Sequence, residues 1–258
     1  MKRPRWAAGR PKSGWTIRCS KTSRSRSWWR RFRTLSPKAR LYCRDNNGVY
    51  HSRLLAAQPW LDHGFGTRAA DPPRSAITLK QIHSDRILRV GDRLHSCEGD
   101  ALITSHPGTF VAVKTADCVP ILIADPESHA VAAVHAGWRG TVLGIAVKTL
   151  RRLEAEFRAD AGKLLIAIGP CIGGCCYEVG PEVAQQFQEL LPERDDLDAR
   201  TRLDLAEVNL RQLCEAGVRP DHISIARRCT LCGGEEFHSF RRDRERAGRM
   251  LSVIGLPA

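Results

Sequence analysis

Two histidines and one cysteine of this chain have the chemistry of a metal site: His83, Cys118 and His135. Imidazole and thiolate are favoured ligands of Zn²⁺, and three protein ligands leave a fourth position open for water or a substrate. A zinc-bound water is a nucleophile near neutral pH. The three residues are far apart in sequence and form no local motif, so a packed cysteine and two hydrogen-bonded core histidines explain them equally well.

The same atoms allow a second chemistry. Cys118 could be a thiol nucleophile activated by His135, as in Cys–His hydrolases. One thiolate cannot be both a metal ligand and a free nucleophile, so the zinc content of the protein separates these interpretations.

Three arginines mark candidate anion sites. Arg139 lies between Gly137 and Gly140, just before a predicted helix whose first amides could bind an anion. A tight strand-to-helix turn explains this segment equally well. Arg241 and Arg242 follow an aromatic segment and could clamp a phosphate or simply carry solvated charge.

Cys229 and Cys232 form half of a zinc or redox motif, Cys-x-x-Cys. A structural zinc site needs four ligands, so the second pair would have to come from Cys171, Cys175 or Cys176.

The candidate ligands lie at the ends of predicted strands. Apolar runs predict strands over 110–113, 119–124 and 130–134; Cys118 precedes the second of them and His135 follows the third. Alternating polarity over 77–83 predicts a further strand that ends at His83 and pairs with 86–90. Loops at strand ends often carry function.

The other predicted elements include both helices and strands. Helical spacing predicts a helix over 141–158 with Thr141 as its N-cap. Further helices are expected over 181–191 and 203–216, and further strands over 49–55, 99–104, 163–169, 222–226 and 250–254. Strands that occur in runs as well as alternating with helices predict an α+β fold with mixed sheets.

Positive charge is concentrated at the N-terminus. The chain has a net charge of +13, but 15 of its 41 Lys and Arg residues and one of its 28 acidic residues lie in 1–47. We expect this segment to be a disordered extension, although an organelle transit peptide or a nucleic-acid-binding arm has a similar composition. Residues 48–258 are expected to form one catalytic domain that is nearly neutral, which argues against nucleic acid as a partner of the core.

No apolar stretch is long enough to span a membrane, and no secretory signal is recognisable. Ten cysteines without an export signal indicate reduced thiols and a cytoplasmic protein.

Several motifs together resemble the laccase-domain (polyphenol oxidase-type) family. They are Lys80–Ser84, Gly99–Ala101, Lys114–Pro120, His135–Gly140, Ile168–Gly173, Tyr177–Gly180 and Phe240–Asp243. Members of this family are read as zinc-dependent purine nucleoside phosphorylases with adenosine deaminase activity, and some are labelled peptidoglycan editing factors. The resemblance runs from about Val49 to Leu256.

The resemblance implies Zn²⁺ on His83, Cys118 and His135. It also implies an α/β/β/α sandwich similar to the catalytic domain of cytotoxic necrotising factors. Phosphate would cleave adenosine, inosine and methylthioadenosine, and water would deaminate adenosine. The protein would be a monomer or a homodimer. Asp117 would orient the site or accept a proton. The residues expected to hold phosphate are Arg68, Arg139, Arg241 and Arg242.

Two departures and two alternatives accompany this interpretation. The family's Gly-Gly-Val-Ser segment is missing after Thr67-Arg68, which puts the substrate range in question, and the N-terminal segment has no family counterpart.

A Cys–His amidase acting on peptidoglycan precursors is one alternative function. A copper-dependent polyphenol oxidase is the other alternative. Nine histidines without a His-x-His pair cannot assemble the four-copper centre of a multicopper oxidase. A single Cu²⁺ could still replace Zn²⁺ at the predicted site.

Overall fold

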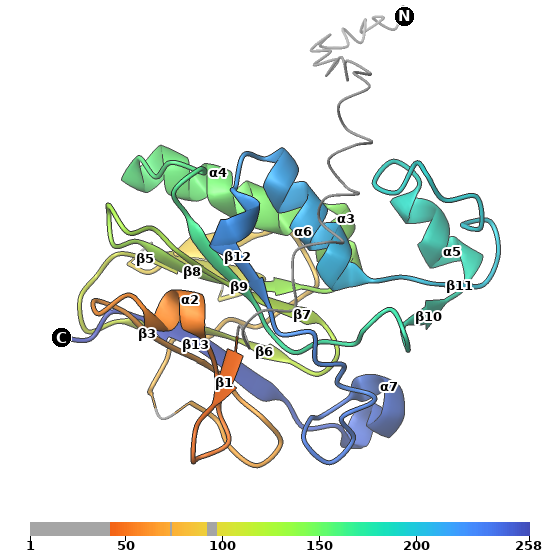
Figure 1. Cartoon of the computed structure of the whole chain (residues 1–258), viewed down its shortest axis with the longest axis horizontal. Coiled ribbons are helices and arrows are strands. Elements are labelled where there is room, and N and C mark those ends of the chain that lie inside the picture. The colour runs from red at the N-terminus through yellow and green to blue at the C-terminus, as the bar shows by residue number, and fades with distance from the viewer. Residues whose placement is uncertain (1–41, 73, 92–96) are drawn as a thin grey trace, which may run out of the picture. The chain divides into compact units, whose positions relative to one another are not determined.

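Two packed β-sheets form the centre of the fold, and helices cover the outer face of one of them (Figure 1). The structure, a computed structural model, describes residues 42–72, 74–91 and 97–258, and these belong to one compact unit. The predictions for residues 1–41 lie outside the described residues. The first described strand, at Tyr42–Arg44, begins before the domain boundary that the sequence predicts.

The smaller sheet has five antiparallel strands in the order β1-β2-β3-β13-β6. These strands are β1 (Tyr42–Arg44), β2 (Tyr50–Ser52), β3 (Asp62–Phe65), β6 (Phe110–Thr115) and β13 (Met250–Gly255). The last strand of the chain, β13, pairs with both β3 and β6, so the C-terminal residues are built into this sheet. Its buried side chains, such as Met250 and Ile254, belong to the main apolar core.

The larger sheet has six strands in the order β12-β9-β7-β8-β5-β4. These strands are β4 (Ile87–Arg89), β5 (Ala101–Thr104), β7 (Val119–Ala124), β8 (Val131–Ala136), β9 (Leu165–Ile168) and β12 (Ile223–Ile225). The two outermost pairs are parallel and the inner pairs are antiparallel. The mixed sheets predicted from the sequence are therefore confirmed. Every residue of β7 and β8 is buried, because both faces of the sheet are covered.

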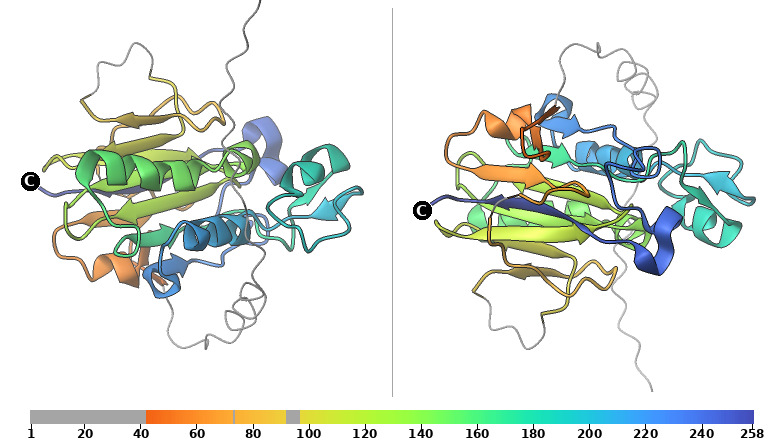
Figure 2. Two further views of the ribbon diagram at one scale, coloured as in Figure 1. Left: turned by 90° about the horizontal axis from the view of Figure 1, so that it is seen from above. Right: turned by 90° about the horizontal axis from the view of Figure 1, so that it is seen from below.

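Three helices cover the outer face of the six-stranded sheet: α3 (Trp138–Val142), α4 (Ile145–Phe157) and α6 (Leu205–Glu215) (Figure 2). Viewed from below in Figure 2, the five-stranded sheet has no comparable helical layer among the described residues, so the predicted fourth layer is not seen there. No helix among the described residues is both long and apolar enough to cross a membrane.

Shorter elements lie around the sheets. They are α2 (Arg53–Ala56), β10 (Glu178–Val179), α5 (Pro181–Ala184), η1 (Gln185–Phe187), β11 (Thr201–Arg202), η2 (Pro220–His222), α7 (Phe240–Asp243) and η3 (Arg244–Arg246). The strand predicted over 49–55 is thus cut short where α2 begins, and the helix predicted over 181–191 is only α5 followed by η1.

The helix predicted over 141–158 is divided in two, and its predicted N-cap is wrong. Gly144 separates α3 from α4 and has a φ of +71°, a conformation that glycine adopts without the steric cost of a Cβ. Thr141 lies inside α3 and is buried, where its hydroxyl accepts a hydrogen bond from Asn209 Nδ2 at 2.9 Å. The helical segment instead begins after Gly137, immediately behind the strand that ends with His135 and Ala136.

The strand predicted over 77–83 does not form, and its predicted pairing with 86–90 is also wrong. Ile77 and Lys80 make only isolated bridges, and β4 pairs in parallel with β5 instead. The segment changes partners along its length, because Ile77 bonds with Phe110 and Ala112 whereas Lys80 bonds with Cys97 and Gly99. At its end, the Asp100 carboxylate accepts the backbone N–H groups of Ile82, His83 and Ser84, which are then not available to a neighbouring strand.

Candidate metal centre and the loops around it

His83, Cys118 and His135 converge at one end of the β7–β8 hairpin. Their ligand atoms all lie within 4.8 Å of one another, and the two imidazole rings meet edge to face with centroids 4.9 Å apart. The hairpin register, which pairs Val119 with Ala136, brings the residues just before β7 close to the end of β8. His135 is buried, Cys118 is partly buried and His83 is exposed, so the group opens to solvent on the His83 side.

Asp100 connects two of the three candidate ligands. Its Oδ1 lies 2.8 Å from His135 Nδ1 and accepts the His83 backbone N–H at 3.0 Å. Its Oδ2 accepts the Ser84 backbone N–H and hydroxyl, both at 2.7 Å. This carboxylate holds His83 in a left-handed turn, with φ +58°, and directs the Nε2 atom of His135 away from itself.

Gly137 leaves the space into which the candidate ligands point. A Cβ at this position would lie 3.1 Å from Cys118 Sγ and 3.1 Å from His83 Cδ2. Contacts this close are tighter than nine in ten of those that real Cβ atoms make, so Cys118 or His83 would have to shift by a few tenths of an ångström. The glycine of the His-Ala-Gly-Trp motif therefore favours close packing beside the site.

Electrostatics favour a thiolate at Cys118. Burial raises the pKa of this thiol, but hydrogen bonds and positive charge from His135 and His83 outweigh burial and bring the pKa down to about 6. Burial lowers the pKa of His135, whereas Asp100 and the Cys118 thiolate raise it to about 9. The lowered pKa of Cys118 and the raised pKa of His135 favour a thiolate next to a protonated imidazole, whose proton a cation such as Zn²⁺ could replace.

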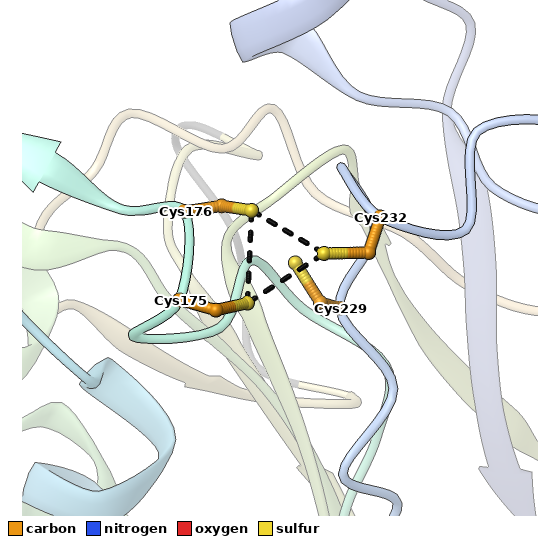
Figure 3. Close-up of side chains that lie close together, drawn as sticks. All are labelled: Cys175, Cys176, Cys229 and Cys232. Carbon is orange, nitrogen blue, oxygen red and sulfur yellow. Dashed lines mark hydrogen bonds between the residues drawn. The ribbon is translucent and has the colours of Figure 1, made fainter.

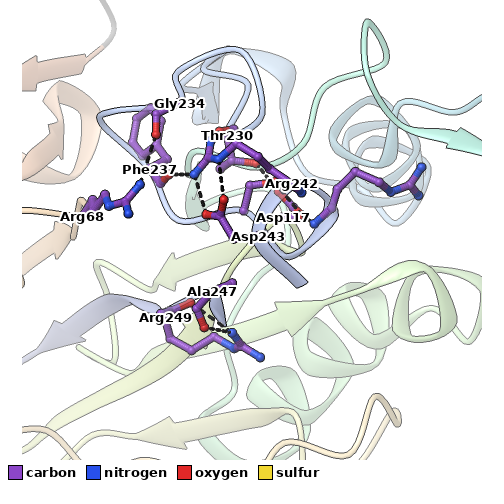
Figure 4. A network of polar contacts seen from close by, with 12 residues as sticks. Arg68, Asp117, Thr230, Gly234, Phe237, Arg242, Asp243, Ala247 and Arg249 are labelled. Atoms are coloured by element: carbon purple, nitrogen blue, oxygen red, sulfur yellow. Dashed lines mark hydrogen bonds and ion pairs between the residues drawn. The ribbon is translucent and has the colours of Figure 1, made fainter. Parts of the chain in front are cut away.

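Asp117, predicted to orient the site or accept a proton, holds the segment that leads into α7 (Figure 4). Its carboxylate accepts the Thr230 hydroxyl at 2.6 Å, the Ser239 hydroxyl at 3.0 Å and the Arg241 backbone N–H at 2.6 Å. The residue is buried and has a φ of +89°. With three donors on its two oxygens, Asp117 is better placed to fix this segment beside Cys118 than to move a proton.

Arg241 lies against Tyr177, and the Arg139 guanidinium lies over the Trp138 ring at 4.5 Å from its centroid. The Arg241 guanidinium lies over the Tyr177 ring at 5.3 Å and donates to the Glu178 carbonyl at 2.7 Å. Burial and the charge of Cys118 raise the pKa of Tyr177 to about 12, while the charges of Arg241 and Arg139 act in the opposite direction.

The other two predicted phosphate ligands are engaged elsewhere (Figure 4). Arg242 donates to the Phe237 carbonyl at 2.8 Å and forms an ion pair with Asp243 at 2.8 Å. Arg68 contacts the Gly234 carbonyl at 3.4 Å through its exposed side chain. Arg242 is thus used to hold the loop before α7 together.

Two residues of the site were not among the predicted site residues. In the sequence, Asp100 is marked only as part of a Gly-Asp-Ala motif. The spacing of the residues does not predict the contact between its carboxylate and His135. Tyr177 was visible only in the Tyr-Glu-Val-Gly motif after the cysteine-rich loop. In both cases the short motif was the only signal in the sequence.

Comparison with known proteins identifies one family and several named relatives of this chain. Residues 65–257 match the family described as multi-copper polyphenol oxidoreductase laccase. A Deinococcus radiodurans protein named purine nucleoside phosphorylase is 44% identical over 184 residues, covering 69% of this chain and 69% of that protein. Purine nucleoside phosphorylase YlmD of Geobacillus stearothermophilus is 41% identical over 227 residues, covering 82% of this chain and 80% of that protein.

A solved structure shows the same fold. The crystal structure of the Bacillus licheniformis hypothetical protein YfiH superposes with a TM-score of 0.75 at 28% identity, covering 84% of this chain and all of that one (100%). The mixed α/β architecture described above is therefore shared with this protein.

Proposed function

The chain belongs to the multi-copper polyphenol oxidoreductase laccase family, and we propose that it is a zinc-dependent purine nucleoside phosphorylase with adenosine deaminase activity. Relatives that carry the name purine nucleoside phosphorylase support the first activity. The observation that carries the proposal is the convergence of His83, Cys118 and His135. Arg241 is tied to Asp117, the residue before Cys118, by a hydrogen bond of 2.6 Å.

The donor set fits zinc. Two imidazoles and one thiolate are borderline-soft ligands, and three of them leave a coordination position for a reactant. Bound Zn²⁺ supplies Lewis-acid polarisation of an oxygen atom. Asp100 holds His135 by Nδ1, which leaves Nε2 as its ligand atom, and Gly137 keeps the space in front of Cys118 free.

The arginines account for the use of phosphate. Arg139, four residues after His135, and Arg241, whose backbone N–H is bonded to Asp117, are the two residues proposed to hold phosphate, because guanidinium groups bind phosphate oxygens in bidentate fashion. Phosphate held there would attack the anomeric carbon of the ribose, whose departing purine takes up a proton. Deamination of adenosine would use water in place of phosphate as the attacking group.

Asp117 and Asp100 act by positioning in this proposal. Asp117 fixes the backbone of Arg241 through a hydrogen bond of 2.6 Å, so the guanidinium of that residue starts from a defined place. Asp100 fixes the turn at His83 and the ring of His135. Pre-organised groups of this kind lower the reorganisation needed to reach the transition state.

Copper oxidation and thiol catalysis are less well supported. A four-copper relay needs many histidines, whereas the described cluster holds two. A nucleophilic Cys118 would also use the lowered pKa of this thiol, but the relatives are named purine nucleoside phosphorylases and not amidases. A cytoplasmic location belongs to this proposal because the cysteine ligand must stay reduced.

Phosphate-dependent turnover tests the proposal. We expect purified protein to release hypoxanthine from inosine only when phosphate is present, and Cys118→Ala to lose most of this activity together with its bound zinc at this site. Cys214→Ala, on α6, is the matched control and should keep both. Undiminished turnover by Cys118→Ala, or turnover without phosphate, would contradict the proposal.

A further inference from the structure

Four cysteines outside the site described above converge on one point (Figure 3). Cys175 and Cys176 come from the loop between β9 and β10, and Cys229 and Cys232 come from the loop after β12. All four sulfur atoms lie within 4.8 Å of one another. The sequence pairs them as Cys-Cys and Cys-x-x-Cys, so the partner pair that the second motif lacked is supplied from far away in the chain.

The sulfur separations match a tetrahedral metal site. Cys175 and Cys232 are 3.6 Å apart, Cys176 and Cys232 are 3.4 Å apart, and Cys175 and Cys176 are 3.6 Å apart. Four thiolates on Zn²⁺, with Zn–S bonds of about 2.3 Å, lie about 3.8 Å from one another. A disulfide requires about 2.05 Å, and the four thiols are free.

The backbone around Cys229 is already arranged for a thiolate. The Gly173 N–H donates to the Cys229 sulfur at 3.3 Å. Such N–H···S contacts fix the position of a ligating sulfur and offset its negative charge.

We infer that Cys175, Cys176, Cys229 and Cys232 bind a second, structural Zn²⁺ ion that is distinct from the His83/Cys118/His135 site. Four protein thiolates complete the tetrahedral shell, so no position remains for a substrate. The ion clamps together two loops that already meet through hydrogen bonds between the Thr230 N–H and the Cys171 carbonyl, at 3.0 Å.

The position of this clamp gives it a role at the neighbouring site. Cys176 directly precedes Tyr177, and Cys229 directly precedes Thr230, whose hydroxyl donates to Asp117 at 2.6 Å. The zinc therefore holds in place two residues that border the candidate active centre. This inference concerns metal binding alone and does not rest on the proposed phosphorylase activity.

Metal counting on the full-length protein, purified with a reductant and without chelator, tests the inference. We expect about two zinc ions per chain in the wild type, about one in Cys118→Ser, about one in Cys229→Ser and none in the double variant. Cys214→Ser is the matched thiol control and should keep about two. A Cys118→Ser count near zero, or a Cys229→Ser count equal to that of the wild type, overturns the inference, whereas a wild-type count of one that Cys118→Ser keeps counts against zinc at the His83/Cys118/His135 site instead.

Two further measurements cover the case in which Cys229→Ser fails to fold. Cobalt loaded into Cys118→Ser, which keeps all four cysteines, should show the intense sulfur-to-metal charge-transfer absorption of a tetrathiolate site. Titration of the wild type with a mercurial should release the zinc of this site as about four thiols are consumed. A cobalt spectrum without thiolate charge transfer, or disulfides among the four cysteines in the reduced preparation, overturns the inference.

Discussion

Replacement of Asp100 by asparagine probes the arrangement of the candidate centre most sharply. The carboxylate accepts hydrogen bonds from the backbone N–H groups of Ile82, His83 and Ser84 and from the Ser84 hydroxyl, and it bonds His135 Nδ1. Asparagine has almost the same shape but turns one acceptor into a donor. Whichever oxygen is replaced, at least one N–H group then faces another donor.

The expected magnitude follows from the charge of Asp100. Burial raises its pKa, but His135 and Ser84 outweigh burial and lower it to about 2, from an ordinary value of 3.8. A depression of this size corresponds to about 2 kcal/mol of stability. Because the pKa is lowered in the folded state, this contribution is complete above about pH 4 and is lost as the pH falls towards 2. The variant should lack this acid-dependent loss.

Asp100→Asn should also weaken zinc binding at the candidate metal centre. Loss of an outer carboxylate partner typically weakens metal affinity by about 10–100-fold. We would measure the zinc concentration that half-protects Cys118 from iodoacetamide, read for its own peptide by mass spectrometry, so that other thiols do not interfere. Urea unfolding of the same samples gives the stability change.

Asp125→Asn is the matched control. Asp125 is equally buried and accepts the Glu127 N–H, the Ser128 N–H and the Ser128 hydroxyl, but it lies at the other end of β7 from Cys118. Its replacement should cost about 1–2 kcal/mol of stability and leave zinc protection of Cys118 unchanged. Equal zinc affinity in Asp100→Asn and wild type, or an equal loss in both variants, would refute the reasoning.

Three other predictions concern neighbouring residues. Gly137→Ala puts a methyl group 3.1 Å from Cys118 Sγ, so zinc protection of Cys118 should weaken about tenfold or more; unchanged protection would contradict the packing argument. Arg241→Gln should raise the phosphate KM about tenfold with little effect on the melting temperature. Arg242→Gln should lower the melting temperature and leave the phosphate KM nearly unchanged. The reverse result would mean that Arg242 binds phosphate and Arg241 stabilises the loop. In metal-free protein, alkylation of Cys118 should be half-maximal near pH 6, because its pKa is lowered and the thiolate dominates above it; a midpoint above pH 8 would contradict this.

The sequence predicted the centre of the fold well because the signal there is local. Continuous apolar runs bounded by polar residues predicted strands at β6, β7 and β8 almost to their ends. The interruption at Gly144 was missed because the apolar spacing of α3 and α4 continues across it. The likeness to the catalytic domain of cytotoxic necrotising factors stays a prediction.

The candidate site was predicted as far as residue chemistry allowed. The types of His83, Cys118 and His135 indicated a metal, but their convergence depends on how the hairpin pairs and on a turn that Asp100 holds. The spacing of residues along the sequence does not predict such long-range hydrogen bonds. For the same reason the sequence could not show that the guanidinium of Arg242, predicted to hold phosphate, forms an ion pair with Asp243; its role at phosphate stays a prediction.

The pairing of the two cysteine motifs was also beyond local reasoning. Cys175 and Cys176 are separated from Cys229 by two α-helices, two 3-10 helices and three short strands, and the parallel pairing of β9 with β12 brings the two loops side by side. The sequence named Cys171 as an equally good partner, but this thiol is buried and is not part of the cluster.

Anomalous diffraction at the zinc absorption edge, from crystals of the full-length protein, tests the central claim most directly. We predict a peak bonded to Cys118 Sγ, His135 Nε2 and the His83 imidazole, with a fourth position free for phosphate or water. A fully reduced protein, crystallised with zinc present, that shows no peak between these three side chains would contradict the account.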